Sequence, residues 1–283
     1  MRHLVPLILL FASSCSKPED STNVFRFTAI PDTNSSELEL KFKPVAAYLT
    51  DKLGVPVEYI ATSDYSASVE MFKNGDVQLA WFGGLSGAQA RAAVDGAQAI
   101  AQGVEDPNFK TYFVAHNSTK IEKSKAFPKA LQGLSFTFGS ATSTSGRLMP
   151  EHFVSEYTGR TPAEFFGNEN AFSGSHDKTA KLVEAGTFKA GALNYITYDR
   201  MVAEGKLDPE VCKVVWETPT YPDYNWTVHG NVDSEMVNKI QQALLDMKDP
   251  ELLKAIDRPN GLIKATNADF APIHELAQQL NFL

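Results

Sequence analysis

The sequence predicts an α/β protein whose sheets are covered by helices on both faces. Apolar, strand-like runs alternate with amphipathic segments from residue 24 onward, and such alternation is typical of parallel sheets packed between helices. Glycine and serine gather at three points where a strand passes into a helix. Because ligands of such folds bind beyond the carboxyl ends of the strands, these three junctions are where a binding site is expected.

The first half of the chain alternates in this way without a break. Strands are expected at 24–30, 55–61, 77–82, 97–104 and 111–116, and helices at 37–53, 65–74 and 86–95. The helix 37–53 has the clearest pattern, with apolar residues at helical spacing from Leu38 through Phe42 to Leu49. Gly54 follows it and is expected to close it.

The second half repeats the pattern. Strands are expected at 134–138, 171–172, 190–195 and 211–216, and helices at 148–157, 179–185 and 234–245 with further helix after it. Trp81, Phe82 and Trp216 lie on apolar strands and are expected in the core, as is Cys212.

Composition limits the function classes. The 283 residues, 43% of them hydrophobic, suffice for one large or two medium domains. A net charge of -8 argues against a nucleic-acid partner, which requires a basic face. The six histidines and two cysteines show no metal-ligand spacing, so neither a metal nor another cofactor is expected.

The N-terminus resembles a bacterial lipoprotein signal. Basic Arg2 and His3 precede the apolar run 4–11, which is too short to span a bilayer. Small residues then lead to Cys15, as in a lipobox, although Ala12 stands where leucine is usual. Residues 1–15 are therefore expected to be a signal peptide, Cys15 the lipidation site and 16–23 a tether, which places the protein in the periplasm or at the cell surface. The alternative is simple signal cleavage with an incidental Cys15.

The loop at Ser143, Thr144, Ser145 and Gly146 is the strongest candidate for a binding element. It lies between the strand 134–138 and a helix. The first N–H groups of a helix have no internal partners, and with hydroxyl donors and a glycine they form a seat for a tetrahedral anion. The alternative is an ordinary Ser/Thr helix cap. No base adjoins these hydroxyls and no Gly-x-Ser-x-Gly elbow is present, so a hydrolase is not expected.

Two other junctions share this character. Gly83 and Gly84 follow the strand 77–82, and Ser175 and His176 follow 171–172. All three junctions are expected to converge on one anion, with independent helix caps as the alternative reading.

Together these stretches resemble the phosphate/phosphite/phosphonate family of periplasmic substrate-binding proteins of ABC transporters, closest to its putative selenate-binding branch. The resemblance runs from about Phe25 to the C-terminus. It is carried by Ile30-Pro31-Asp32, Asp64-Tyr65, Gly75-Asp76-Val77, Ala80-Trp81-Phe82-Gly83, Ser143-Thr144-Ser145-Gly146, Ser175-His176-Asp177 and Tyr221-Pro222-Asp223-Tyr224-Asn225-Trp226.

The resemblance implies a two-lobed, type II periplasmic-binding-protein fold with a hinge and a central cleft. Lobe 1 would comprise 24–113 plus 228–283 and lobe 2 would comprise 114–227, with crossings near 112–116 and 221–229. It implies a monomeric, non-enzymatic receptor that delivers a small anionic solute to a permease and an ATPase. A sensor that reports the same anion to a membrane histidine kinase is the alternative.

The resemblance also implies ligand contacts from Ser143, Thr144, Ser145, Tyr65 and His176. The family has an aromatic residue after the glycine turn, where this chain has Leu85-Ser86-Gly87.

The identity of the anion depends on carboxylates. Hydrogen phosphate and phosphite carry a proton that a carboxylate can accept, whereas selenate requires donors alone. The strand 190–195 offers the neutral Asn194, Asp177 is expected to cap its helix, and Asp199 is expected out of reach. The sequence therefore favours a selenate-type oxyanion over an aminoalkyl phosphonate, with Asn194 as a ligand contact.

Overall fold

The computed structural model describes residues 24–283. The expected signal peptide, Cys15 and the tether lie outside these residues. Within them, no helix is both long and apolar enough to cross a membrane.

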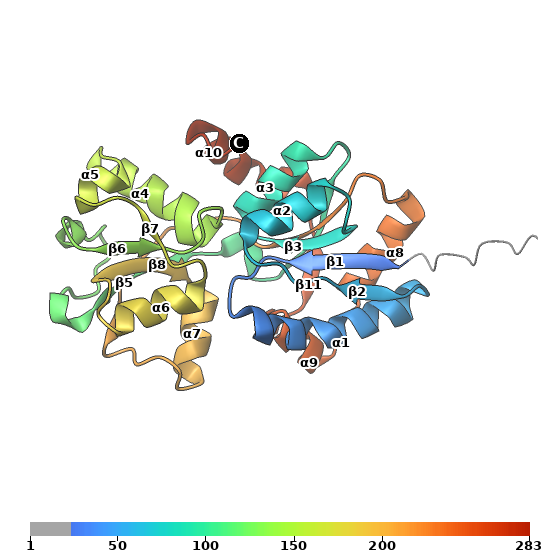
Figure 1. Ribbon diagram of the computed structural model, residues 1–283, viewed down its shortest axis with the longest axis horizontal. Helices are drawn as coiled ribbons and strands as arrows, with labels where there is room; N and C mark the ends of the chain where they lie inside the picture. The colour runs from blue at the N-terminus through green and yellow to red at the C-terminus, as the bar shows by residue number, and fades with distance from the viewer. Residues whose placement is uncertain (1–23) are drawn as a thin grey trace, which may run out of the picture.

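Two sheets form two lobes that lie side by side (Figure 1). The first sheet has six strands in the order β11-β4-β10-β3-β1-β2. Its strands are β1 Phe25–Ala29, β2 Val57–Tyr59, β3 Leu79–Phe82, β4 Gln98–Gly103, β10 Asn225–Val228 and β11 Leu262–Lys264.

The second sheet has five strands in the order β7-β6-β8-β5-β9. Its strands are β5 Thr111–His116, β6 Phe136–Phe138, β7 Ala171–Phe172, β8 Ala190–Asn194 and β9 Cys212–Glu217.

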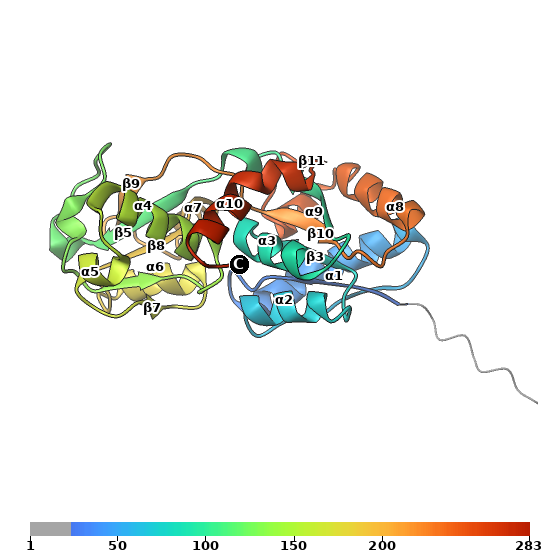
Figure 2. The same cartoon turned by 90° about the horizontal axis from the view of Figure 1, so that it is seen from above.

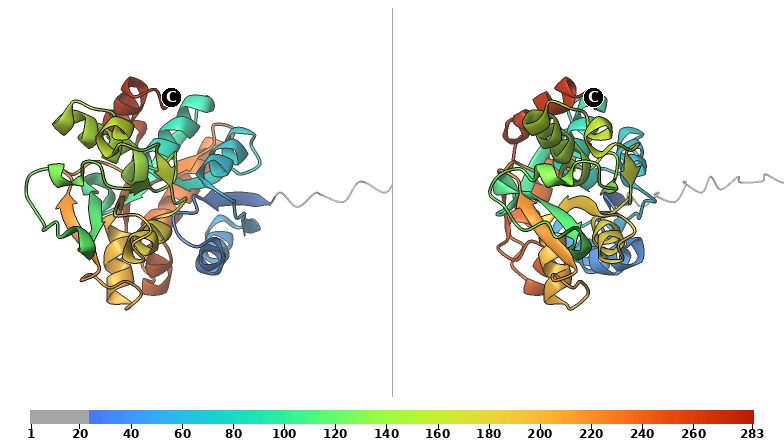
Figure 3. Two further views of the ribbon diagram at one scale, coloured as in Figure 1. Left: turned by 60° about the vertical axis from the view of Figure 1, so that its left-hand side comes forward. Right: turned by 90° about the vertical axis from the view of Figure 1, so that its left-hand side faces the viewer.

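Helices cover both faces of each sheet. In the first lobe these are α1 Ser35–Leu53, α2 Tyr65–Lys73, α3 Gly84–Ala93, α8 Ser234–Leu245, α9 Pro250–Ala255 and α10 Ala271–Gln279. In the second lobe they are α4 Met149–Thr158, α5 Pro162–Phe166, α6 His176–Glu184 and α7 Tyr195–Ala203. Seen from above, α10 lies over α3 and brings the chain end between the lobes (Figure 2). Figure 3 looks toward the second lobe and shows helices on both sides of its sheet.

Local chemistry explains the predicted helices. Asn34 caps α1 by accepting from the Ser36 N–H, and Gly54 ends it at a φ of 71°, which glycine adopts without strain. The apolar stripe of α1, Leu38 through Leu49, is buried as expected. Trp81, Phe82, Trp216 and Cys212 are buried as well.

The α/β class is confirmed, but the sheets are mixed rather than parallel. β10 runs antiparallel to both β3 and β4, and β5 runs antiparallel to both β8 and β9. Each of these strands enters a sheet from a segment that has just crossed between lobes, so it arrives from the opposite direction. The residue pattern of a single strand does not indicate whether that strand runs parallel or antiparallel to its neighbours. β10 was expected to be part of a crossing segment and not a strand.

The two crossing segments lie earlier in the chain than expected. β5 belongs wholly to the second sheet and β10 to the first, so the predicted lobe boundaries at 113/114 and 227/228 fall inside strands. The joining segments are 104–110 and 218–224. They pair with each other, because the Phe109 and Tyr221 backbones exchange two hydrogen bonds of 2.9 Å.

A buried ion pair fixes this double crossing. Asp106, in the first segment, accepts from the Arg258 Nη2 at 2.7 Å, and both side chains are almost completely buried. Arg258 also lies over the Tyr224 ring, 4.7 Å from its centroid. The arginine therefore ties the loop after α9 to both crossings.

We expect Asp106→Asn to lower the free energy of unfolding by about 3 kcal/mol, because it leaves a buried guanidinium without its counter-charge. Urea denaturation measures this. The control is Glu70→Gln, which breaks the exposed Lys73–Glu70 pair and should cost under about 0.5 kcal/mol. A loss below about 1 kcal/mol for Asp106→Asn would contradict the role of the pair.

Candidate ligand-binding site

The Ser143–Gly146 loop forms a tight turn at the end of β6. Ser143 begins a π-helix at Thr144–Leu148, and its Oγ accepts from the Gly146 N–H at 3.0 Å. π-Helical turns are rare and are often found at functional sites. A methyl group on Gly146 would lie 3.0 Å from the Gly139 Cα, so glycine is required here. Ser143, Thr144 and Ser145 are all buried.

The glycine turn of the first lobe faces this loop directly. The Leu85 N–H donates to the Thr144 Oγ1 at 2.9 Å, across the two lobes. The neighbouring Gly84 N–H donates to Asp223 Oδ1 at 2.8 Å. A methyl group on Gly83 would lie 3.1 Å from Asp223 Oδ1 and 3.2 Å from Thr144 Oγ1, so this close approach also depends on glycine.

His176 completes the convergence of the three junctions. It begins α6, and its N–H donates to the Asp32 carbonyl of the first lobe at 2.9 Å. Its Nδ1 accepts from the Asn194 N–H at 3.3 Å, and its Nε2 lies 3.5 Å from the Tyr65 Oη. Burial lowers the pKa of His176 to about 3, so the ring is neutral near pH 7. Since Nδ1 accepts, Nε2 carries the hydrogen and is an uncharged donor toward Tyr65.

Tyr65 comes from the first lobe. Asp64 caps α2 by accepting from the Ala67 N–H at 2.9 Å, which sets Tyr65 at the first helical position. Its ring is buried, and its hydroxyl lies beside Ser143 as well as His176.

Two buried acids join the cluster, and sequence reasoning missed both. Asp32 follows β1, and Asp223 precedes β10. Burial raises the pKa of Asp32 to about 6 and that of Asp223 to about 7. Asp223 Oδ2 is buried without a hydrogen-bond partner. The sequence did contain a signal for both acids. Each one follows a proline within a stretch on which the family resemblance rests.

The structure brings every predicted contact residue into this cluster. One of them differs from the expectation, because its side chain is already hydrogen-bonded to other protein groups. Tyr65, Gly83, Gly84, Ser143, Thr144, Ser145, His176 and Asn194 all lie in the cluster. The Asn194 amide, however, is engaged by protein, since Oδ1 accepts from the Thr197 N–H at 2.6 Å and Nδ2 donates to the Tyr224 hydroxyl at 2.9 Å. Asp177 accepts from the Ser175 hydroxyl, and Asp199 accepts from the Tyr112 hydroxyl at 3.4 Å, so both acids are engaged by neighbouring side chains.

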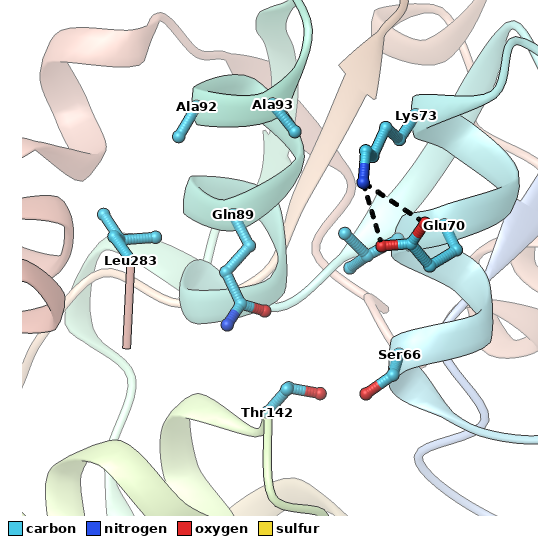
Figure 4. A pocket seen from close by; sticks show the side chains of 9 residues that line it. Ser66, Glu70, Lys73, Gln89, Ala92, Ala93, Thr142 and Leu283 are labelled. Atoms are coloured by element: carbon cyan, nitrogen blue, oxygen red, sulfur yellow. Dashed lines mark hydrogen bonds and ion pairs between the residues drawn. The ribbon is translucent and has the colours of Figure 1, made fainter. Parts of the chain in front are cut away.

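A hollow of about 400 Å³ opens beside the cluster. Figure 4 shows it between α2 and α3, with Thr142 of the second lobe at one end. Lys73 on its wall is paired with Glu70, so the hollow offers no free cation for an anion. Among the described residues, no group of three or more histidine, cysteine or acidic side chains could hold a metal ion.

The arrangement is suited to holding an anion. Hydroxyl, amide and neutral imidazole donors from both lobes lie in one buried cluster with Asp223, whose Oδ2 lacks a hydrogen-bond partner. Such donors act strongly in a site from which water is excluded.

Comparison with known proteins gives consistent matches. The family model described as "ABC transporter, phosphonate, periplasmic substrate-binding protein" matches residues 27–270. A probable ABC transporter phosphite-binding protein of Prochlorococcus marinus is 35% identical, over 98% of this chain and 97% of its own length. A phosphate-import protein of Mycolicibacterium smegmatis is 28% identical, over 83% of this chain and 77% of its own.

Solved structures agree on the fold. The Prochlorococcus marinus protein PhnD1, in complex with methylphosphonate, superimposes with a TM-score of 0.86 at 34% identity, covering 93% of this chain and 100% of that one. A binding component of a phosphonate ABC transporter from Pseudomonas aeruginosa has a TM-score of 0.79 at 21% identity, covering 90% and 86%. The two-lobed type II fold expected from the sequence is thereby confirmed.

The raised pKa of Asp223 predicts a pH effect on stability. Its pKa in the fold lies above the unfolded value of 3.8. Its contribution to stability is therefore complete below pH 3.8, falls as the pH rises from there, and levels off above the folded pKa of about 7. Relative to Asp223→Asn, which does not titrate, the wild type should gain about 1 kcal/mol of unfolding free energy between pH 8 and pH 6.5. Comparing the two proteins cancels the opposing contribution of His176. Urea titrations at both pH values measure this, and parallel pH profiles would contradict it.

Proposed function

Because the chain belongs to the periplasmic phosphonate-binding family of ABC transporter substrate-binding proteins, we propose that it captures phosphite or a short alkylphosphonate. The protein is a binding component and not an enzyme. In this proposal the lobes close on the anion and present it to a permease driven by an ATPase. Transport is preferred to the sensor alternative because the matching family consists of transport proteins.

The observation that carries the proposal is the unpartnered Asp223 Oδ2 within a cluster of donors. A buried acceptor without a partner costs free energy. A ligand with a P–OH group supplies the missing hydrogen, while its other oxygens accept from hydroxyl and N–H groups. Asp223 is only partly protonated near pH 7, and its ionised form is matched better by an anion that can carry one proton than by an anion that carries none.

This carboxylate changes the choice made from the sequence. The selenate preference rested on the view that no acid faces the ligand. Asp223 and Asp32 are both buried in the cluster, and a fully ionised selenate placed beside their ionised forms would meet like charge, which costs several kcal/mol in an interface. Selenate remains a compound to test, and we propose phosphite and methylphosphonate in its place.

The close spacing of the cluster supports a small ligand. Groups from opposite lobes come within 2.9 Å of each other at Leu85 and Thr144. Leu85 stands where the family has an aromatic residue, and its side chain is buried in the hydrophobic core. We propose that a hydrogen atom or a methyl group on phosphorus is accommodated more readily than an aminoalkyl chain.

The cellular setting is part of the same proposal. Lipidation of Cys15 would hold a monomeric receptor near its permease by the 16–23 tether. This rests on the sequence pattern alone, since these residues lie outside the described part of the chain.

Isothermal titration with a panel of anions tests the proposal. At pH 7 phosphite and methylphosphonate should bind about 100-fold more tightly than selenate or sulfate, because only they carry a proton for Asp223. Asp223→Asn should reduce this ratio of affinities about tenfold or more.

The control for this panel is Asp199→Asn, an acid of the second lobe that lies near Tyr112, and it should leave the preference unchanged. Tighter binding of selenate than of phosphite by the wild type would overturn the proposed ligand. No binding of any phosphorus, sulfur or selenium oxyanion would overturn the proposed function.

A further inference from the structure

Asp32 is bonded to the second lobe directly through its backbone and indirectly, by way of Tyr224, through its side chain. Its carbonyl accepts from the His176 N–H at 2.9 Å. Its Oδ2 accepts from the Tyr224 hydroxyl at 3.0 Å, which in turn accepts from Asn194 Nδ2 at 2.9 Å. His176 and Asn194 belong to the second lobe, whereas Asp32 belongs to the first.

The direction of this hydrogen-bond chain is fixed by its surroundings. Asn194 Oδ1 already accepts from the Thr197 N–H, at the start of α7. The amide must therefore turn its NH₂ toward Tyr224. The tyrosine hydroxyl has a single hydrogen, which is left to donate to Asp32. Each of the three side chains is buried, so solvent does not compete for these bonds.

The Tyr224 ring is anchored to the first lobe, and only its hydroxyl meets the second. The ring stacks on Trp81 of β3, with centroids 4.6 Å apart. Arg258 lies over it at 4.7 Å, fixed in turn by Asp106. A rigid ring presents the hydroxyl at one position, which Asn194 reaches only when the lobes are together.

We propose that the Asn194–Tyr224–Asp32 chain is a latch that holds the two lobes closed and thereby sets the rate at which ligand leaves. This rests on the proposed function, because it assumes that the lobes close on an anion. It assigns Asn194 to closure rather than to ligand contact, and Tyr224 to positioning. The latch forms whenever the lobes close, with or without an anion. In the bound protein it must break before the ligand leaves, so its loss is expected mainly as faster dissociation.

Tyr224→Phe tests the latch because it removes both hydrogen bonds and keeps the stacked ring. We expect methylphosphonate affinity to fall about tenfold by titration calorimetry. Stopped-flow tryptophan fluorescence should place this loss in faster dissociation, with the association rate within about twofold of wild type. The matched control is Tyr198→Phe, whose hydroxyl donates to the Cys212 carbonyl inside the second lobe. It should lower thermal stability without changing affinity or dissociation.

A double-mutant cycle separates a latch from two independent contacts. Asn194→Ser keeps a hydroxyl to cap α7 but is too short to reach Tyr224. Because the two residues share one hydrogen bond, the double variant should bind no more weakly than Tyr224→Phe alone. Additive losses, or a Tyr224→Phe dissociation rate within about twofold of wild type, would overturn the proposal.

Solution scattering distinguishes failure of the latch from failure of the proposed function. Without any anion, Tyr224→Phe should have a larger radius of gyration than wild type, and Tyr198→Phe should not. This comparison stands even if no oxyanion binds. Equal radii for the three ligand-free proteins would also count against the latch.

Discussion

The requirement that buried polar groups be hydrogen-bonded governs the region between the lobes. Donors at the strand ends of one lobe meet acceptors of the other at Leu85–Thr144 and at His176–Asp32. Neither lobe satisfies these groups alone. In the proposed mechanism, closure therefore assembles the site, and an anion that enters it becomes one more partner in the same network.

The double crossing connects this local chemistry to both lobes. Arg258 binds Asp106 in the first crossing and covers Tyr224 at the end of the second. Asp223 and Tyr224 are the last two residues of the segment 218–224, so the proposed proton acceptor and the proposed latch residue lie within the second crossing. In the proposed closure, rotation at this segment would move both residues together.

Short-range patterns were sufficient to predict most of the helices, the core strands and the three junctions, whereas α5 and α7 had no counterpart among the expected elements. α8 matched the expected 234–245 because its apolar spacing and Asp233 cap are local features.

The direction of β5 and β10 was missed because it depends on which lobe the chain comes from. Asp223 was missed for a similar reason. Its role depends on burial against Gly84, 139 residues away, and no local pattern records that contact. Asn194 was placed correctly near the cluster, but its engagement with Tyr224 depends on tertiary packing.

Hydrogen exchange at two backbone amides tests most directly whether closure on an anion builds the site. The N–H groups of Leu85 and His176 bond across the lobes, whereas the Phe165 N–H bonds to Thr161 within the second lobe. NMR exchange rates measured with and without methylphosphonate should show slower exchange at Leu85 and His176 when the ligand is present, and no change at Phe165. Equal rates at all three amides in both conditions, with ligand shown to be bound by calorimetry, would contradict assembly of the site by closure.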